Sequence, residues 1–145
     1  MQNKKFKPLI GKTFYVIWIP TILLLLAATV ISFWTPLALV ILVSADIFVG
    51  YFMFSSIAGY VELRENEVFV KFGFMTSVEI PYENIRGFSK ERKLYSDSML
   101  SIKNSLEHIN IKYNKIAIVS VSVVNNDELI SDIEERIEAK KAKKY

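Results

Sequence analysis

The sequence contains a single histidine, His108, which directly follows Glu107. A histidine and a carboxylate within hydrogen-bond reach could act as a general base and the group that orients it. In a strand, however, adjacent side chains point to opposite faces, so these two would not meet. The alternation places His108 with Leu106, Asn110 and Lys112, and it favours a surface or edge histidine over a catalytic one.

Asp46 is the only charged residue between Phe14 and Phe54. An ionisable side chain within an apolar span is costly, and it faces the interior of a helix bundle or water. Asp46 could belong to a proton or ion pathway. It could instead hydrogen-bond to the preceding apolar run, through Thr29 or Ser32, or to a second copy of the chain. One carboxylate without partners makes a poor pathway, so the sequence favours the structural role.

No other pattern in the sequence indicates an enzyme or a cofactor. The chain has no cysteine, which excludes disulfides and cysteine-based metal sites, and it has no Gly-rich phosphate loop or nucleophile elbow. The net charge is only +3, and basic residues gather at the two ends of the chain. A nucleic-acid-binding domain would more often carry a basic stripe through its folded part. We therefore expect no catalysis, no cofactor, no metal and no nucleic-acid partner.

Two apolar runs dominate the N-terminal part of the chain, at residues 13–33 and 36–57. A bilayer core of about 30 Å requires about 20 apolar residues in a helix. The first run is too long for the apolar region of a cleaved signal peptide, and the second run follows it directly. We therefore expect two membrane-spanning helices joined by a tight turn, rather than a signal peptide or a buried soluble hairpin. Trp18 and Tyr51 suit the aromatic belt at one membrane interface.

Lysines predict the orientation of this hairpin. Lys4, Lys5, Lys7 and Lys12 precede the first span. Basic residues next to a span stay in the cytoplasm. A hairpin then returns the chain to the same side, so we expect a multi-pass protein of the plasma membrane with both termini cytoplasmic.

The composition divides the chain into four parts. A basic cytoplasmic segment at 1–12 precedes the hairpin at 13–57, a folded cytoplasmic domain occupies 59–139, and a basic tail occupies 140–145. The segment after the hairpin contains all the alternating patterns, so we expect its core to be self-contained. We expect disorder after about Ala139.

After Gly59 the pattern changes to alternating apolar and polar residues, which is typical of half-buried strands. The last element is an amphipathic helix after Asn125, with Asn126 as a second capping residue. Short antiparallel strands followed by one helix form an α+β pattern, in which the helix closes a bent antiparallel sheet or half-barrel. A polar loop without periodicity lies at 91–105. The predicted strands are 60–63, 68–72, 77–80, 85–90, 106–113 and 116–124.

Three segments resemble bacterial PH domains of the YyaB-like group: VFVKFG at 68–73, IPYENI at 80–85 and SLEHINIKY at 105–113. The resemblance covers about 60–138 and implies a PH-like fold, and two preceding hydrophobic spans are common in such proteins. Glu107 and His108 stand where the group has Asp and Arg. If the Asp–Arg pair of the group is structural, it is weakened here, and if it binds a ligand, the ligand differs here. The positions of the family motif are Gly73, Ile80, Pro81, Tyr82, Ile85, Ser105, Leu106, Glu107, His108 and Tyr113.

Eukaryotic PH domains that bind inositol phosphates place several Lys and Arg around the first hairpin. Here Arg64 is flanked by Glu62, Glu65 and Glu67, so the sequence does not favour phosphoinositide binding. A separate basic cluster is either a solvated loop or a contact for anionic lipid or a partner, at about 1 kcal/mol per residue near a membrane surface. This cluster comprises Arg86, Lys90, Arg92 and Lys93.

The sequence therefore predicts a non-enzymatic, membrane-anchored PH-like interaction module at the inner face of the plasma membrane. Its sheet edge or its 91–105 loop would recruit a protein or peptide partner. The alternative is a self-immunity protein against a membrane-active peptide such as a bacteriocin, which the association of some membrane-bound relatives with immunity implies. Homo-oligomerisation stays open.

Overall fold

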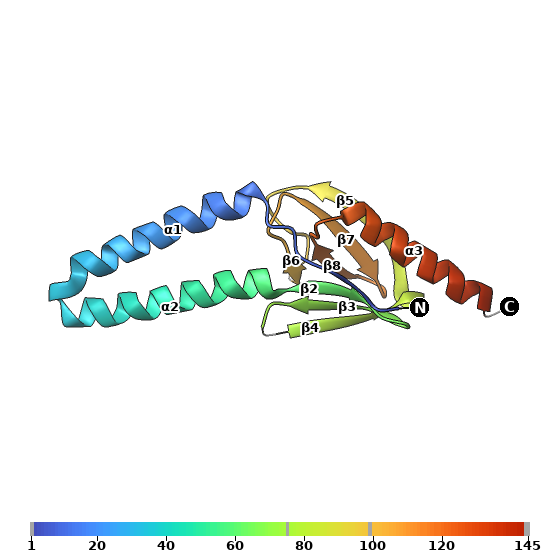
Figure 1. The fold of residues 1–145 in the computed structure, drawn as a ribbon, viewed down its shortest axis with the longest axis horizontal. Helices are drawn as coiled ribbons and strands as arrows, with labels where there is room; N and C mark the ends of the chain where they lie inside the picture. The colour runs from blue at the N-terminus through green and yellow to red at the C-terminus, as the bar shows by residue number, and fades with distance from the viewer. Residues whose placement is uncertain (1, 75, 99, 144–145) are drawn as a thin grey trace.

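A computed structural model, which describes residues 2–74, 76–98 and 100–143, shows two long helices projecting from one end of a β-rich domain (Figure 1). Helix α1 spans Lys12–Ile31 and α2 spans Pro36–Ala58, with a short 3-10 turn, η1, at Ser32–Trp34 between them. Pro36 begins α2, where its fixed φ suits a first helical turn. The domain closes with helix α3 at Asn126–Lys143.

The domain contains two four-stranded sheets. The first sheet is antiparallel in the order β1-β2-β3-β4, and the second has the order β5-β7-β8-β6, with only the β6–β8 pair parallel. A 3-10 turn, η2, at Tyr82–Asn84 joins the two sheets. The strands are β1 Lys4–Phe6, β2 Tyr60–Leu63, β3 Glu67–Phe72, β4 Thr76–Pro81, β5 Ile85–Arg92, β6 Ser101–Ile102, β7 Glu107–Tyr113 and β8 Ala117–Val121.

Alternating apolar residues form the core between the sheets and α3. Val61 and Val70 pair across β2 and β3 and are fully buried, as is Ile109 of the second sheet. Leu129 and Ile133 of α3 pack into the same cluster. Burying each such side chain contributes about 1.5–3 kcal/mol. The expected fold class, a helical hairpin plus a PH-like α+β domain closed by a terminal helix, is confirmed, although the two sheets do not close into one barrel.

The N-terminal segment contributes a strand that the sequence analysis did not predict. β1 pairs with β2, and Phe6 lies opposite Val61 and joins the buried core. The helical hairpin is therefore inserted between two neighbouring strands of one sheet. The expectation that residues after Gly59 hold a self-contained core is wrong, because Phe6 belongs to that core.

The 91–105 segment and the C-terminus also differ from expectation. β5 continues to Arg92, and the two-residue strand β6 lies inside the predicted loop. α3 continues to Lys143 rather than ending near Ala139, while residues 144–145 lie outside the described residues. Lysines in its last turns favour the helix because they complement its dipole. The C-terminal end of α3 lies at the opposite end of the molecule from the hairpin turn (Figure 1).

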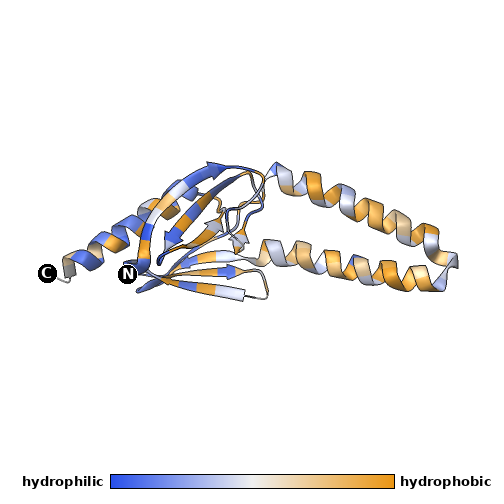
Figure 2. Cartoon of the chain, turned by 180° about the vertical axis from the view of Figure 1, so that it is seen from behind, coloured by the Kyte–Doolittle hydropathy of each residue, from blue (hydrophilic) through white to orange (hydrophobic). Residues whose placement is uncertain are grey.

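The two projecting helices are apolar along most of their length (Figure 2). Each of the two apolar segments, Lys12–Trp34 and Pro36–Ala58, has 23 residues and is long and apolar enough to cross a membrane. None of the residues in their most apolar stretches is buried inside the protein. A core helix of a soluble domain would be mostly buried, so this exposure favours a lipid environment.

Candidate functional site

The helix α2 is joined to the domain without a linker. Gly59 alone separates α2 from β2, and the turn after β3 packs against the last part of α2. The backbone N–H of Phe74 donates to Ser55 Oγ at 3.1 Å. Gly73 has a φ of +62°, and a Cβ at this position would lie 2.4 Å from the Ser55 carbonyl oxygen. Only glycine satisfies both the positive φ and the close contact, so α2 packs directly on the backbone of the sheet.

Asn104 connects both helices to the second sheet. Its carbonyl accepts a 2.8 Å hydrogen bond from the N–H of Gly11, which precedes α1. Its Nδ2 donates to the Ser56 carbonyl near the end of α2 at 2.7 Å, and the residue is buried. With β1 before α1 and β2 after α2, both ends of the hairpin are fixed to the domain.

Asp46 lies where α2 faces α1. Thr29 Oγ1 donates to Asp46 Oδ2 at 2.8 Å, so Asp46 bonds to one of the two residues that the sequence analysis named. Among the described residues, no group of three His, Cys, Asp or Glu side chains could hold a metal ion. The arrangement supports a structural role for Asp46 within the hairpin.

We expect Asp46→Asn to leave the hairpin and its insertion intact, because the amide oxygen can accept the same hydrogen bond from Thr29. Thr29→Val removes the donor and should cost about 0.6 kcal/mol, the average for such bonds between membrane helices. Denaturant unfolding of the full chain in detergent micelles measures the free energy of unfolding of both variants. Ser44→Ala is the control, since Ser44 bonds only within its own helix. A larger loss from Asp46→Asn than from Thr29→Val would contradict this role.

His108 is buried, so the expectation of a surface or edge histidine is wrong. It is 1% exposed and lies opposite Glu91 across the β5–β7 pair. Its Nδ1 lies 3.1 Å from the Leu106 carbonyl oxygen, and its Nε2 has no hydrogen-bond partner among the residues that the structure describes. The described residues of the segment between β5 and β6 lie over this face, where Asp97 bonds to Asn110, and the lack of periodicity in this covering segment hid that role. Glu107 is exposed at the adjacent position, so the two residues do not form a catalytic pair.

Polar side chains on this covered face bond to one another. Ser120 Oγ donates to Asn110 Oδ1 at 2.6 Å, and Asn110 Nδ2 donates to Asp97 of the covering segment at 3.4 Å. Lys93 pairs with Glu91 at 2.7 Å. The hydrogen bond from this ammonium holds the pKa of Glu91 below its ordinary value. These contacts fix the covering segment on the sheet.

Three of the four sheet edges carry features that discourage pairing with another chain. β1 has three residues, two of them lysines, and β6 has only two residues. Arg86, Lys90 and Arg92 of β5 are exposed, and the register of this strand shifts between Ile85 and Gly87. Short length, charge and irregular register are the ways in which proteins block exposed edges.

β4 is the open edge. It has six residues in continuous register with β3, and its other side pairs with no strand that the structure describes. Thr76, Ser77 and Glu79 are exposed, and Glu79 is its only charged residue. An edge of this kind presents unpaired N–H and C=O groups to another strand. The sequence predicted this strand but not its place at the edge, because strand order leaves no local pattern.

The positions of the family motif support the fold. Ile80 and Tyr82 are buried in the core, and Gly73 contacts α2. Ser105 packs against Gly11. A Cβ added at position 11 would lie 2.8 Å from the Oγ of Ser105. A family model described as Bacterial PH domain matches residues 59–137, more than half of the chain.

The chain belongs to the bacterial PH domain family. PH domains are generally non-catalytic modules, which agrees with the expected lack of enzymatic activity. A search of curated proteins and a search of solved structures each found no match. The match begins at residue 59, so strand β1 and the hairpin lie outside it. The YyaB-like subgroup stays a prediction.

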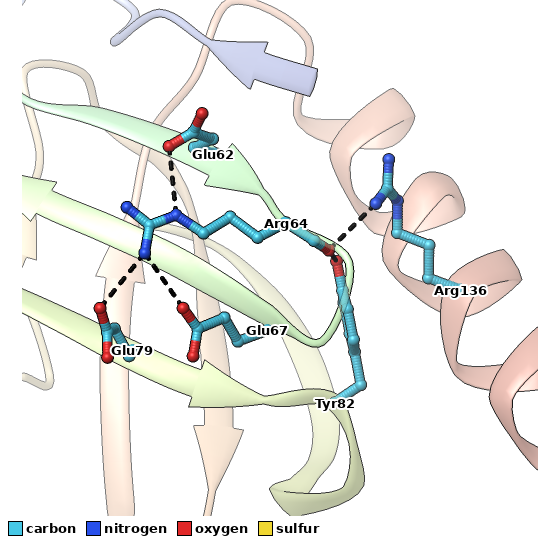
Figure 3. A network of polar contacts seen from close by, with 6 residues as sticks. All are labelled: Glu62, Arg64, Glu67, Glu79, Tyr82 and Arg136. Atoms are coloured by element: carbon cyan, nitrogen blue, oxygen red, sulfur yellow. Dashed lines mark hydrogen bonds and ion pairs between the residues drawn. The ribbon is translucent and has the colours of Figure 1, made fainter. Parts of the chain in front are cut away.

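Arg64, in the turn of the first hairpin of this PH domain, is already paired and so is not available to a phosphate. Arg64 lies among three carboxylates, with contacts of 3.4 Å to Glu62, 3.1 Å to Glu67 and 3.2 Å to Glu79 (Figure 3). Its guanidinium also lies 3.8 Å from the centre of the Phe69 ring. These contacts raise the pKa of Arg64, with the hydrogen bonds to Glu67 and Glu62 outweighing the lowering effect of burial. The Arg64 side chain is therefore held on the surface of the first sheet by its neighbours.

The backbone of Arg64 is also a point of assembly for the PH domain. Its carbonyl accepts hydrogen bonds from Tyr82 Oη at 2.9 Å and from Arg136 Nη1 at 3.1 Å (Figure 3). Arg136 Nη2 donates to the Gln2 carbonyl at 2.6 Å. Burial raises the pKa of Tyr82, which keeps its hydroxyl a hydrogen-bond donor. The turn after β2, α3 and the N-terminal segment thus meet at one buried site.

The predicted basic cluster does not form one continuous patch. Arg86 and Arg92 lie near opposite ends of β5, six residue steps or about 20 Å apart along the strand. Lys90 forms an ion pair with the first acidic residue of α3, and Lys93 pairs with Glu91. As a contact for anionic lipid or a partner, this cluster remains a proposal.

Proposed function

We propose that the protein is a non-enzymatic, membrane-anchored PH module at the inner face of the plasma membrane, which recruits an extended protein segment. The observation that carries this proposal is the insertion of the helical hairpin between β1 and β2. A hairpin fixed at both ends would hold the PH domain in one orientation on the bilayer. The lysines before α1 support a cytoplasmic location for the domain and for both termini.

We further propose that the partner binds by strand addition to β4. This strand follows the turn that packs on α2, so its first residue, Thr76, lies near the hairpin and Pro81 lies farther from it (Figure 1). A segment that emerges from the same bilayer could pair along residues 76–80, whereas Pro81 has no N–H to donate. Backbone hydrogen bonds would supply affinity, and side chains such as Val78 would supply specificity.

A photoreactive residue at Ser77 or Glu79 tests this proposal in native membranes. We expect both positions to form an adduct with the same partner, because both are exposed on β4. Lys115, in the turn between β7 and β8, is the matched control and should form none. A second copy of the chain as partner would indicate a homo-oligomer, and a membrane-active peptide would favour the immunity function. Equal adducts at Lys115 and β4, or none at β4, would contradict strand addition.

A soluble version of the PH domain, with residues 2–10 joined to 59–143, should bind anionic vesicles weakly and without selectivity for inositol phosphates. Replacing Lys90, Arg92 and Lys93 by Ala should weaken binding more than Arg64→Ala, because it removes three positive charges while Arg64 lies among three carboxylates. Binding should fade with added salt, since exposed charges are screened over about 8 Å at physiological ionic strength. Vesicle sedimentation measures this effect. Salt-resistant, headgroup-selective binding would show that a phosphate site exists.

A further inference from the structure

Two turns of the PH domain expose large apolar side chains beside the hairpin. Phe74, in the turn between β3 and β4, is 54% exposed, and Leu94 and Tyr95, between β5 and β6, are 70% and 66% exposed. These turns come from different sheets, yet both contact the helices. Their apolar surfaces therefore flank the hairpin where it meets the domain.

The contacts of these turns place them alongside the helices rather than beyond their ends. The Phe74 ring centre lies 5.7 Å from that of Tyr51 on α2. Leu94 lines a shallow depression together with Phe14 and Trp18 of α1. Trp and Tyr gather at the membrane–water interface of spanning helices. Phe74 thus contacts Tyr51, and Leu94 lies beside Trp18, so both turns lie next to aromatic residues that suit one interface of the hairpin.

Helix geometry gives the depth of this contact. Tyr51 lies 15 residues after Pro36, or about 22 Å along α2 at 1.5 Å per residue. The hydrocarbon core of a bilayer is about 30 Å thick. If η1 lies at the far interface, Tyr51 falls about 8 Å inside the inner boundary of the hydrocarbon, a depth that interfacial apolar side chains reach, and Phe74 falls beside it. Trp18 lies 13 residues before Ile31, at about 20 Å, which gives Leu94 a similar depth.

The turn between β5 and β6 is also held in shape for such a contact. Lys103 Nζ donates a hydrogen bond to the Tyr95 carbonyl, which fixes the exposed end of the turn. Lys93 Nζ lies 5.5 Å from the centre of the Tyr95 ring. Lysines beside apolar side chains suit the headgroup layer, where the charge meets anionic lipid and the apolar part enters the acyl boundary.

We infer that Phe74, Leu94 and Tyr95 insert into the interfacial layer of the bilayer that the hairpin crosses. The inference rests on the proposed function, because it requires the hairpin to span the membrane. The PH domain then contacts lipid through both of its sheets as well as through α1 and α2. This additional contact holds the β4 edge at a fixed height and angle above the bilayer, which favours partners that emerge from the same membrane.

The absence of native cysteine allows a direct test in the full chain. Single nitroxide labels at Phe74→Cys, Leu94→Cys and Tyr95→Cys, in anionic lipid nanodiscs, report collisions with oxygen and with a water-soluble nickel chelate. We expect oxygen to dominate at all three positions, as in lipid. Ile116→Cys is the matched control: it is 93% exposed but lies in the turn between β7 and β8, and nickel should dominate there. Ile41→Cys, within α2, reports the span itself.

The outcomes separate this inference from the proposed function. Dominant nickel collisions at the three turn positions, with oxygen dominant at Ile41→Cys, would overturn interfacial insertion and leave the anchored hairpin intact. Dominant nickel collisions at Ile41→Cys would overturn the spanning hairpin. All three labelled side chains are exposed, so their replacement leaves the core unchanged. If the Phe74 variant fails to fold, Leu94→Cys and Tyr95→Cys report on the other sheet independently.

Discussion

The segment 59–143 is expected to remain unfolded or molten on its own, and to fold when residues 2–10 are joined to it by a flexible linker. Phe6 is 7% exposed and packs in the core, and β1 pairs along all of its three residues with β2. Truncating a buried Phe to Ala costs about 3–5 kcal/mol, and a whole domain is stable by only about 5–15 kcal/mol. Loss of β1 therefore removes a large part of the stability of this small domain.

Thermal unfolding by circular dichroism, with an NMR spectrum of each protein, measures this effect. A Gly/Ser linker of about 10 residues should reach between the ends that the hairpin leaves, because such chains span about 17 Å on average. Within the joined protein, Phe6→Ala should unfold the domain or lower its stability by about 3–5 kcal/mol. Lys7→Ala is the control, since Lys7 is exposed. A cooperative transition of 59–143 at the same temperature as the joined protein would contradict the role of β1.

Gly73→Ala is expected to separate the sheet from α2 and to destabilise the full chain by about 2–5 kcal/mol. A left-handed backbone costs a non-glycine residue about 1–2 kcal/mol, and forced packing costs about 1–3 kcal/mol more. The added Cβ would lie 2.4 Å from the Ser55 carbonyl oxygen, and backbone atoms cannot move aside as a flexible side chain can.

Gly87→Ala provides the matched control for this substitution. Gly87 has no atom within 4 Å of an added Cβ, and its φ is not positive. In chemical unfolding of the full chain in detergent micelles, Gly87→Ala should therefore have a free energy of unfolding close to that of the parent protein. A similar loss for both variants would show that the contact between Gly73 and Ser55 does not hold the junction.

Local patterns were sufficient to predict most elements of this fold. Alternation identified the strands of residues 60–121 other than β6, because one face of each packs on the core. Helical spacing identified α3. Thr29, which donates a hydrogen bond to Asp46, was also one of the two polar partners expected from the sequence.

Contacts distant in sequence could not be predicted in the same way. β1 has three residues, two of them lysines, and it pairs with a strand on the far side of the hairpin. The burial of His108 depends on a covering segment without periodicity. The open edge at β4 depends on strand order, which adjacent residues do not encode. The candidate site therefore became visible only with the assembled sheets.

We propose that the hairpin crosses the plasma membrane and holds the PH domain on its inner face. Single cysteines at Thr35→Cys, in the hairpin turn, and at Lys115→Cys, in the turn between β7 and β8, test it with a membrane-impermeant maleimide on intact cells. We predict labelling of Thr35→Cys from outside, and labelling of Lys115→Cys only after the membrane is permeabilised. Labelling of Lys115→Cys on intact cells, or protection of Thr35→Cys on them, would contradict the account.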